Sequence, residues 1–484
     1  MDKNNVIHKQ ISRNIDFLKN FFVQTPDFVI RYLKVANQEQ QAALVYLETL
    51  TNMDNLYHYL LIPLIYEGIE MDMLYSDCPV GFFQKAKGWN EIQDAILEGK
   101  SIVFLENVQF ALIFSTQGGP KRAIEESKIE TSLKSGHEGF VESKNENIAL
   151  IRRYIKETNF TIKEICIGTN QQTKVSILYL KGSACEKILQ ELESRIKKIQ
   201  GTYILNAGEL GELIEDQLYS PFPQFLSTER PDTVALYLYQ GRFAILTDQS
   251  PSILIAPVCF TDFFKTIDDY STRLLIANFM RILRYFAFLL AILLPASYIS
   301  VVSFNYEIIP MQLLLTIGKY RADVPFSPFI EAIIMELSIE MLRESAVRLP
   351  SIIGHTIGVV GAIIIGQAAV QAGIVSNMMI IVVASTAIAS FIIPNYDMGA
   401  TIRLIRFPMM ILASLFGIIG IVIGIMTIIG HLISLQSLGT PYSQSLFPIQ
   451  LENRKDFIFR SSLRHLRYLS KKENRNTKQE KKNE

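Results

Sequence analysis

Cysteine is scarce in this chain of 484 residues, and the few cysteines form no recognisable pattern. They are Cys78, Cys166, Cys185 and Cys259. Their spacing is not that of a metal site, and four are too few for the disulfide framework of a small secreted protein. We therefore expect reduced thiols in a protein that stays inside a cell.

The motifs of the common enzyme classes are also missing. The sequence has no phosphate-binding loop, no GxGxxG after a predicted strand, no HExxH, no GxSxG and no paired CxxC. These absences argue against catalysis, so we predict no catalytic residue, no cofactor and no metal. A nucleic-acid partner is not predicted either.

Charge is unevenly distributed along the chain. Before Arg284, charged and apolar residues are mixed as in a soluble protein, whereas charges become sparse from 285 to 450. The first residues are polar and lack the apolar stretch of a signal peptide. We therefore expect an α+β cytoplasmic head, followed by an all-α polytopic transmembrane domain over 281–440.

Uncharged runs predict four membrane spans in this second part. The expected spans are 285–304, 351–372, 374–394 and 407–435. Arginines precede the first run, and the tail at 441–484 is rich in Lys and Arg, a bias that places both chain ends in the cytoplasm. We interpret the basic tail as a topological signal, with contact to anionic lipid head groups as the alternative.

An amphipathic helix is predicted between the first two spans, at 327–349. At the helical period, the carboxylates of Glu336, Glu340 and Glu344 lie on one stripe, and the other side is apolar. An acidic stripe in or near a membrane would attract cations towards a water-filled path. The alternative is an interfacial helix in which Glu344 pairs with Arg348.

The run that begins at 351 has two different faces when it is wound as a helix. One face consists of small residues, which suit close packing against another helix. The other face carries polar side chains with two apolar ones between them: Thr356, Val360, Ile364, Gln367 and Gln371. This second face is typical of a wetted pore wall with an apolar gate, unless the glutamines bond to adjacent helices instead. His355 and His431 are interpreted as helix-packing residues rather than proton relays.

The head divides into two mixed α/β subdomains, at 1–150 and 151–275. In the first, we predict a helix at 39–61 and strands at 101–106 and 109–114. In the second, we predict strands at 160–168, 173–180, 242–247 and 252–258, and helices at 184–200 and 233–240.

Short motifs follow one another from the head into the apolar part. Two of them lie in the head: Ser220-Pro221-Phe222-Pro223-Gln224 and Thr228-Glu229-Arg230-Pro231-Asp232. Others lie further along: Pro325-Phe326-Ser327-Pro328 and Gly366-Gln367-Ala368-Ala369. We interpret the first two as a rigid turn and a helix start rather than a ligand site. In this order the set resembles the GerA family, specifically the A subunits of spore germinant receptors. The likeness covers roughly 125–450, and the first hundred residues match no family pattern.

The resemblance implies a subunit of a nutrient receptor in the spore inner membrane or the cell membrane. Its expected partners are membrane lipid, a transporter-like B subunit, a lipoprotein C subunit and further copies of itself. It also implies a homo-oligomeric ion channel that opens in response to amino acids or sugars. Three alternatives stay open: a non-conducting scaffold or signalling subunit, a solute transporter with alternating access, and a membrane-bound enzyme.

Overall fold

A computed structural model describes residues 7–22, 25–35, 41–62, 64–65, 83–118, 130, 132, 134–168, 173–199, 204–349, 361, 364–444 and 459–460. Its contacts divide the chain into two compact units. Unit 1 consists of Met1–Asp216, Phe225–Val258 and Ser437–Gly439. Unit 2 consists of Gln217–Gln224, Cys259–Gln436 and Thr440–Glu484. Each unit thus includes a short segment whose sequence neighbours belong to the other.

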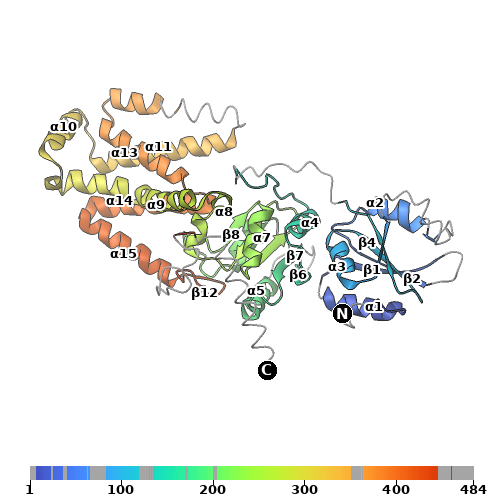
Figure 1. Ribbon diagram of the computed structural model, residues 1–484. Helices are drawn as coiled ribbons and strands as arrows, with labels where there is room; N and C mark the ends of the chain where they lie inside the picture. The colour runs from blue at the N-terminus through green and yellow to red at the C-terminus, as the bar shows by residue number, and fades with distance from the viewer. Residues whose placement is uncertain are drawn as a thin grey trace. The chain divides into compact units, whose positions relative to one another are not determined.

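The first sheet of unit 1 is antiparallel throughout. Its strands are β1 (Phe28–Lys34), β2 (Gln41–Leu47), β3 (Phe83–Ala86), β4 (Ser101–Leu105) and β5 (Ala111–Phe114). They lie in the order β1-β2-β4-β5-β3. Figure 1 labels β1, β2 and β4 of this sheet. The helices of this part are α1 (Ile11–Phe21), α3 (Trp89–Leu97) and α2 (Met53–Leu56), which continues as the π-helical turn η1 (Tyr57–Leu61).

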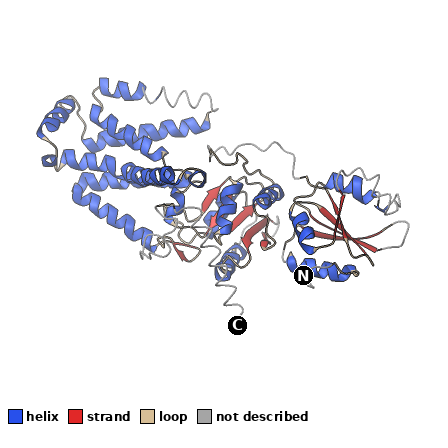
Figure 2. Ribbon diagram, viewed as in Figure 1, coloured by secondary structure: helices blue, strands red, loops and turns tan. Residues whose placement is uncertain are grey.

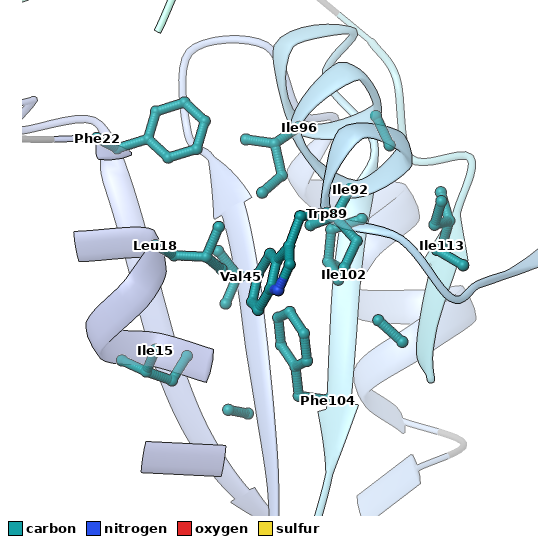
Figure 3. Close-up of a cluster of buried hydrophobic side chains, with 14 of the residues drawn as sticks. Ile15, Leu18, Phe22, Val45, Trp89, Ile92, Ile96, Ile102, Phe104 and Ile113 are labelled. Atoms are coloured by element: carbon teal, nitrogen blue, oxygen red, sulfur yellow. The ribbon is translucent and has the colours of Figure 1, made fainter. Parts of the chain in front are cut away.

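Both faces of this sheet are buried, because β2 sends alternate side chains into two separate cores. Val45 packs with Trp89 of α3 in one core (Figure 3). Leu44 packs with Leu56 of α2 in the other. The helix expected at 39–61 is therefore wrong over 41–47, which forms β2, and confirmed over 53–61, which forms α2 and η1. A strand that is covered on both faces is apolar at nearly every position. Its sequence therefore lacks the alternation that would distinguish it from a buried helix.

The second sheet is also antiparallel. Its strands are β6 (Phe160–Ile167), β7 (Thr173–Leu180), β8 (Leu226–Thr228), β9 (Phe243–Thr247) and β10 (Ile253–Ala256), in the order β6-β7-β9-β10-β8. Its helices are α4 (Lys144–Tyr154), α5 (Glu186–Lys198), α6 (Ala207–Ile214) and α7 (Pro231–Tyr239). Leu192 and Ile196 of α5 and Leu210 of α6 share one core with Ile177 and Ile245 of the sheet.

Most predictions for the head are confirmed, with ends that differ by one to a few residues. The strands at 101–106 and 109–114 are β4 and β5. The four strands and two helices predicted after 151 are β6, β7, β9, β10, α5 and α7. Pro231 occupies the first turn of α7, where a missing N–H costs nothing. These elements could be predicted because glycine, proline and polar turns separate short apolar runs.

Unit 2 is built mainly of helices, whereas the long strands lie in the two sheets of unit 1 (Figure 2). Its helices are η3 (Phe260–Phe264), α8 (Asp268–Ser271), α9 (Leu274–Ser303), η4 (Tyr306–Ile308), α10 (Met311–Arg321), α11 (Pro328–Arg348), a helical segment at 364–371, α13 (Asn377–Phe391), α14 (Tyr396–Phe416) and α15 (Ile418–Ser434). A short hairpin follows, β11 (Gln436–Ser437) and β12 (Thr440–Pro441). The longest helix, α9, packs against α11, α13, α14 and α15.

Two of the described helices, α9 and α14, have the length and hydropathy of a membrane span. Helices α13 and α15 are apolar but shorter. The single helix expected at 407–435 is divided, because Gly417 has a φ of 60° and ends α14. The span expected at 285–304 is the second part of α9, and the helix expected at 327–349 is confirmed as α11.

We expect Gly241→Ala to destabilise unit 1 far more than Gly182→Ala. Both glycines have positive φ, +80° and +92°, so alanine at either position costs about 1–2 kcal/mol in backbone strain. At Gly241 a Cβ would also lie 2.5 Å from the carbonyl oxygen of Ser183, whereas nothing lies within 4 Å at Gly182. Hydrogen exchange of β7 and β9 in the detergent-solubilised chain measures the loss. Equal losses in the two variants would contradict the clash.

Candidate functional site

Charged side chains are buried among the apolar helices of unit 2. On α11, Glu331 and Glu336 are 0% and 1% exposed, whereas Leu337 and Met341 are 48% and 66% exposed. The acidic side of this helix therefore faces its neighbours, and the apolar side faces outward. This is the reverse of a helix on a water-soluble protein, where the apolar stripe is buried.

One arginine of α14 connects three helices at this site. Pro295 lies inside α9 and has no N–H, so the carbonyl of Ala291 loses its partner in the helix. Arg406 Nε donates to that carbonyl oxygen at 2.9 Å. Its Nη1 donates to Glu336 Oε2 of α11. Arg406 is itself 2% exposed, so this ion pair is shielded from solvent and links α9, α11 and α14.

A second set of ion pairs lies further along α11. Glu340 is 3.3 Å from both Arg343 Nη1 and Arg403 Nε. Arg343 also donates to Ser390 Oγ of α13 at 3.3 Å, and its guanidinium lies 4.5 Å from the ring centroid of Phe391. These contacts join α11 to α13 and α14.

A third contact joins the start of α11 to α10 and α13. Glu331 Oε1 lies 3.0 Å from Arg321 Nη1. Its Oε2 accepts from the backbone N–H of Ser376 at 2.9 Å, next to the first turn of α13. Tyr298 of α9 lies beside the same residue, 3.4 Å from Ser376 Oγ. Four helices therefore converge on one buried carboxylate.

The three predicted glutamates of the acidic stripe differ in environment. Glu336 and Glu340 face arginines of α14, whereas Glu344 pairs only with Arg348 of its own helix among the described residues, at 2.6 Å. This last pair is the one that the interfacial-helix alternative predicts. Each of the three carboxylates has a cationic partner, so in this conformation the stripe presents no unpaired negative charge.

The predicted pore residues are described only in part. Thr356 and Val360 lie outside the described residues. Ile364, Gln367 and Gln371 are all exposed, and their spacing places them on one face of the helical segment. Within unit 2 this face is covered by no other described element, and a role in a pore stays a prediction. In the part of the chain that the structure describes, no cluster of His, Cys, Asp or Glu is placed to hold a metal ion.

Comparison with known proteins identifies the family. Residues 16–471 match the profile described as Bacillus/Clostridium GerA spore germination protein. The chain belongs to the GerA family. It is 39% identical to spore germination protein KA of Bacillus subtilis (strain 168) over 462 residues, which are 94% of this chain and 85% of that protein. It is 42% identical to the uncharacterized membrane protein YfkQ of the same organism over 372 residues, or 77% and 72% of the two chains.

A solved structure also matches. The crystal structure of the N-terminal domain of the A subunit of the Bacillus megaterium spore germinant receptor GerK3 aligns with 53% of this chain and 97% of its own. The identity is 28% and the TM-score is 0.40. The GerA family match starts at residue 16, well before the position near 125 where the motifs begin. The N-terminal part therefore belongs to the same family, which its sequence alone did not indicate.

The first GerA-like motif, Pro221 to Gln224, belongs to unit 2. Thr401 of α14 donates to the carbonyl oxygen of Pro221, and Tyr442 Oη donates to that of Pro223 at 2.9 Å. Phe222 is buried, with its ring centroid 5.9 Å from that of His431. The motif thus forms a turn fixed to the helices, and the expectation that His431 has a packing role agrees with this contact. His355 lies outside the described residues.

The second motif, Thr228 to Asp232, lies in unit 1. Arg230 is buried and bonds to Asp232 through Nε and Nη2, at 3.1 and 2.7 Å. Glu130 accepts from Thr228 Oγ1 at 2.7 Å. Burial raises the pKa of the Glu130 carboxyl to about 7, although the bond from Thr228 and the charge of Arg230 oppose the shift. Glu229 offers its backbone carbonyl to Phe140. These contacts fix the motif within unit 1, and its role as a turn and helix start rather than a ligand site stays a prediction.

Of the basic tail at 441–484, the structure describes 441–444, Phe459 and Arg460. Arg460 Nη1 donates to the carbonyl oxygen of Thr272 at 2.8 Å, and its backbone N–H donates to Asn278 Oδ1 of α9 at 2.6 Å. Nearby Asp269 accepts from Arg281 and Arg284. Burial raises the pKa of Asp269, but the bonds and charges of Arg284 and Arg281 outweigh it and leave the pKa below its ordinary value. Part of the tail is therefore held at the start of α9.

Several members of the charged site were not predicted from the sequence. Glu331 lies on α11 outside the predicted stripe, and Arg321 lies on a helix that was not predicted. The link through Arg406 had a visible signal, because a proline inside an apolar helix predicts an unpaired carbonyl four residues earlier. Pro295 and Arg406 are far apart in sequence, however, so nothing identified the donor.

The pKa of Glu130 predicts how the stability of unit 1 depends on pH. The folded carboxyl holds its proton up to about pH 7, while the unfolded one loses it near its ordinary value of 4.5. Stability should therefore fall by about 3 kcal/mol as pH rises from 4.5 to 7, then level off. Glu130→Gln should remove this fall, and Glu157→Gln, at an exposed position, should keep it. Urea midpoints at each pH measure the difference; parallel curves for wild type and Glu130→Gln would refute the assignment.

The buried link at Arg406 predicts a non-additive pair of substitutions. Arg406→Met leaves Glu336 buried without its cationic partner, at a cost of about 3–5 kcal/mol. Adding Glu336→Met removes the stranded charge, so the double variant should be more stable than Arg406→Met alone. Thermal unfolding in detergent measures this difference. Arg348→Met, at the exposed pair with Glu344, is the matched control and should have little effect. A double variant that is less stable than Arg406→Met would contradict the prediction.

Proposed function

We propose that this GerA-family chain is the membrane-embedded A subunit of a spore germinant receptor, located in the spore inner membrane. The observation that carries the membrane part is the reversed polarity of unit 2, in which ion pairs are buried and large apolar side chains face outward. Such exposed residues include Leu275 and Phe279 on α9, Ile381 and Ile388 on α13, Leu404 and Leu415 on α14, and Ile419 and Met426 on α15. In a bilayer these side chains meet hydrocarbon, and the buried charges pair with one another. The relative YfkQ is also described as a membrane protein.

The directions of the helices support six crossings rather than four. The second halves of α9 and α14 meet at Phe304 and Gly417, so these two helices run the same way. Glu331 and Ser376 bring the first turns of α11 and α13 together near Tyr298 of α9, so α11 and α13 run the opposite way. Helix α15 follows the break after α14 and completes the set. Since α11 and α13 run the same way, we propose a sixth crossing between them, of which the helical segment at 364–371 is the described part.

The two ends of the helical part of unit 2 also support an even number of crossings. The backbone N–H of Val258 donates to Ser437 Oγ at 3.1 Å, and both residues belong to unit 1. The chain therefore enters and leaves the helices at one place. This agrees with a head and tail on the same, cytoplasmic side, as the arginines before residue 285 indicate. Helix α11 is included as a span because its 21 residues are about 30 Å long and its charges are paired.

We further propose that copies of the chain oligomerise into a nutrient-gated ion channel together with B-type and C-type subunits. Support comes from the face of Ile364, Gln367 and Gln371, which is exposed within the chain although it carries two amide side chains. In hydrocarbon such amides lack partners, whereas around a shared axis they line a hydrated path. Nutrient binding then shifts the assembly between closed and open arrangements.

One observation favours the non-conducting scaffold as a second candidate. The acidic stripe of α11 is neutralised by Arg403, Arg406 and Arg348, so in this conformation it offers no attraction to a passing cation. A scaffold would use the same pairs only to hold the helices together. The two candidates differ in whether changing the exposed face alters ion flux.

We expect Ile364→Ala to raise the ion flux without nutrient by about 3- to 10-fold, since a smaller side chain weakens an apolar constriction. Ile365→Ala is the matched control, because it makes the same change on the neighbouring residue, about a quarter turn away. Flux is measured in liposomes that contain the chain with its B-type and C-type partners. Unchanged flux in both variants, with no nutrient-dependent flux in wild type, would favour the scaffold.

A further inference from the structure

We infer that the turn at Gln217–Ser220 anchors unit 2 in the head-group region of a bilayer through Leu218 and Tyr219. The inference rests on the proposed function, because it requires α15 to lie in a membrane. It adds a lipid-binding surface outside the helices, next to the first GerA-like motif.

The two side chains lie at the tip of a tight turn. The backbone N–H of Ser220 donates to the carbonyl oxygen of Gln217 at 3.2 Å, which makes Leu218 and Tyr219 the central residues of a β-turn. Tyr219 is 97% exposed and Leu218 is 53% exposed. The turn therefore presents an aromatic and an aliphatic side chain side by side, away from the protein.

Hydrogen bonds hold the segment that carries these two exposed side chains. Gln217 N–H donates to Gln224 Oε1 at 3.0 Å, and Gln224 Nε2 donates back to the Gln217 carbonyl oxygen at 2.7 Å. The same segment is held by the bonds from Thr401 and Tyr442 to its two prolines. An apolar pair held outward so firmly suits a surface that is itself apolar.

The turn lies beside the end of α15. Ser220 Oγ is 2.8 Å from His431 Nε2, in the last turn of that helix. Ser220 also accepts from the backbone N–H of Phe222 at 3.2 Å. The tip of the turn is thus only one residue away from a contact with α15.

An apolar stripe runs the length of α15, on the side of the helix away from His431. Ile419, Met426 and Ile433, seven residues apart, are 69%, 69% and 51% exposed and lie on one face. Polar residues appear at the end of the helix beside the turn, with His431 and Ser434. The change from apolar to polar marks the level at which the hydrocarbon gives way to head groups.

The side chains of Leu218 and Tyr219 suit the head-group region of a bilayer. Tyrosine is enriched at membrane interfaces because its ring contacts the apolar layer while its hydroxyl reaches water. Leu218 supplies a further apolar contact. Neither side chain carries a charge, so the surface fits the interface of a bilayer rather than a particular anionic lipid.

Tryptophan fluorescence tests the anchor in the full-length chain. Trp89 is the only native tryptophan and is 2% exposed in unit 1, so its signal serves as a constant background. Tyr219→Trp places a probe at the turn, Met426→Trp places one in the middle of α15, and Tyr239→Trp places one in unit 1. Each variant is reconstituted in phosphatidylcholine vesicles that carry bromine either close to the head group or deep in the acyl chain.

We expect the probe at Tyr219 to be quenched at least about twofold more by shallow bromines than by deep ones. The probe at Met426 should show the opposite preference, and the probe at Tyr239 should respond only to aqueous acrylamide. If bromines quench the probe at Met426 but not the one at Tyr219, the anchor is refuted. This holds both when acrylamide quenches the probe at Tyr219, which places the turn in water, and when it does not, which places the turn against another protein surface. If bromines quench neither probe, the membrane placement of the proposed function fails as well.

Discussion

The bond from Arg406 to the carbonyl of Ala291 is the contact on which the helical unit depends most. A proline inside α9 leaves that carbonyl without a partner, and in a medium without water a bare carbonyl is costly. One guanidinium both satisfies the carbonyl and neutralises Glu336. Lysine would be a poor substitute, because a single ammonium lacks the planar fork that serves two acceptors in different directions. The defect in one helix thus determines which side chain its neighbour must supply.

The two units follow one rule in opposite directions, because each hides the groups that its surroundings disfavour. In unit 1, both sheets bury apolar side chains such as Trp89, and most charges lie at the surface. In unit 2, the buried groups include Glu336 and Arg406, and residues such as Met426 face outward. A single hydrophobicity scale therefore explains both units, provided that the medium changes between them.

Local patterns in the sequence predicted the elements better than the contacts between them. Strands β6, β7, β9 and β10 are short runs closely bounded by polar turns, so their type was readable. The stretch 41–47 was misassigned as helix because helices cover β2 on both faces, which removes the alternation. The stripe on α11 was visible, but its partners Arg403 and Arg406 come from a distant helix, and no local pattern encodes that pairing. For the same reason, the sequence did not show that the turn after Gln217 belongs with α14 and α15.

The paired stripe on α11 also constrains how a receptor of this kind could open. A hydrated path along that helix requires Glu336 to leave Arg406 or Arg406 to move with it. Separating a buried pair costs about 3–5 kcal/mol. To reverse a strongly biased two-state equilibrium, a ligand must bind one state about 5.5 kcal/mol more tightly than the other. The two energies are of the same order, so under the proposed function such a pair is strong enough to keep a resting assembly closed and weak enough for bound nutrient to overcome. A stripe of unpaired carboxylates would have neither property, since nothing would favour the closed arrangement.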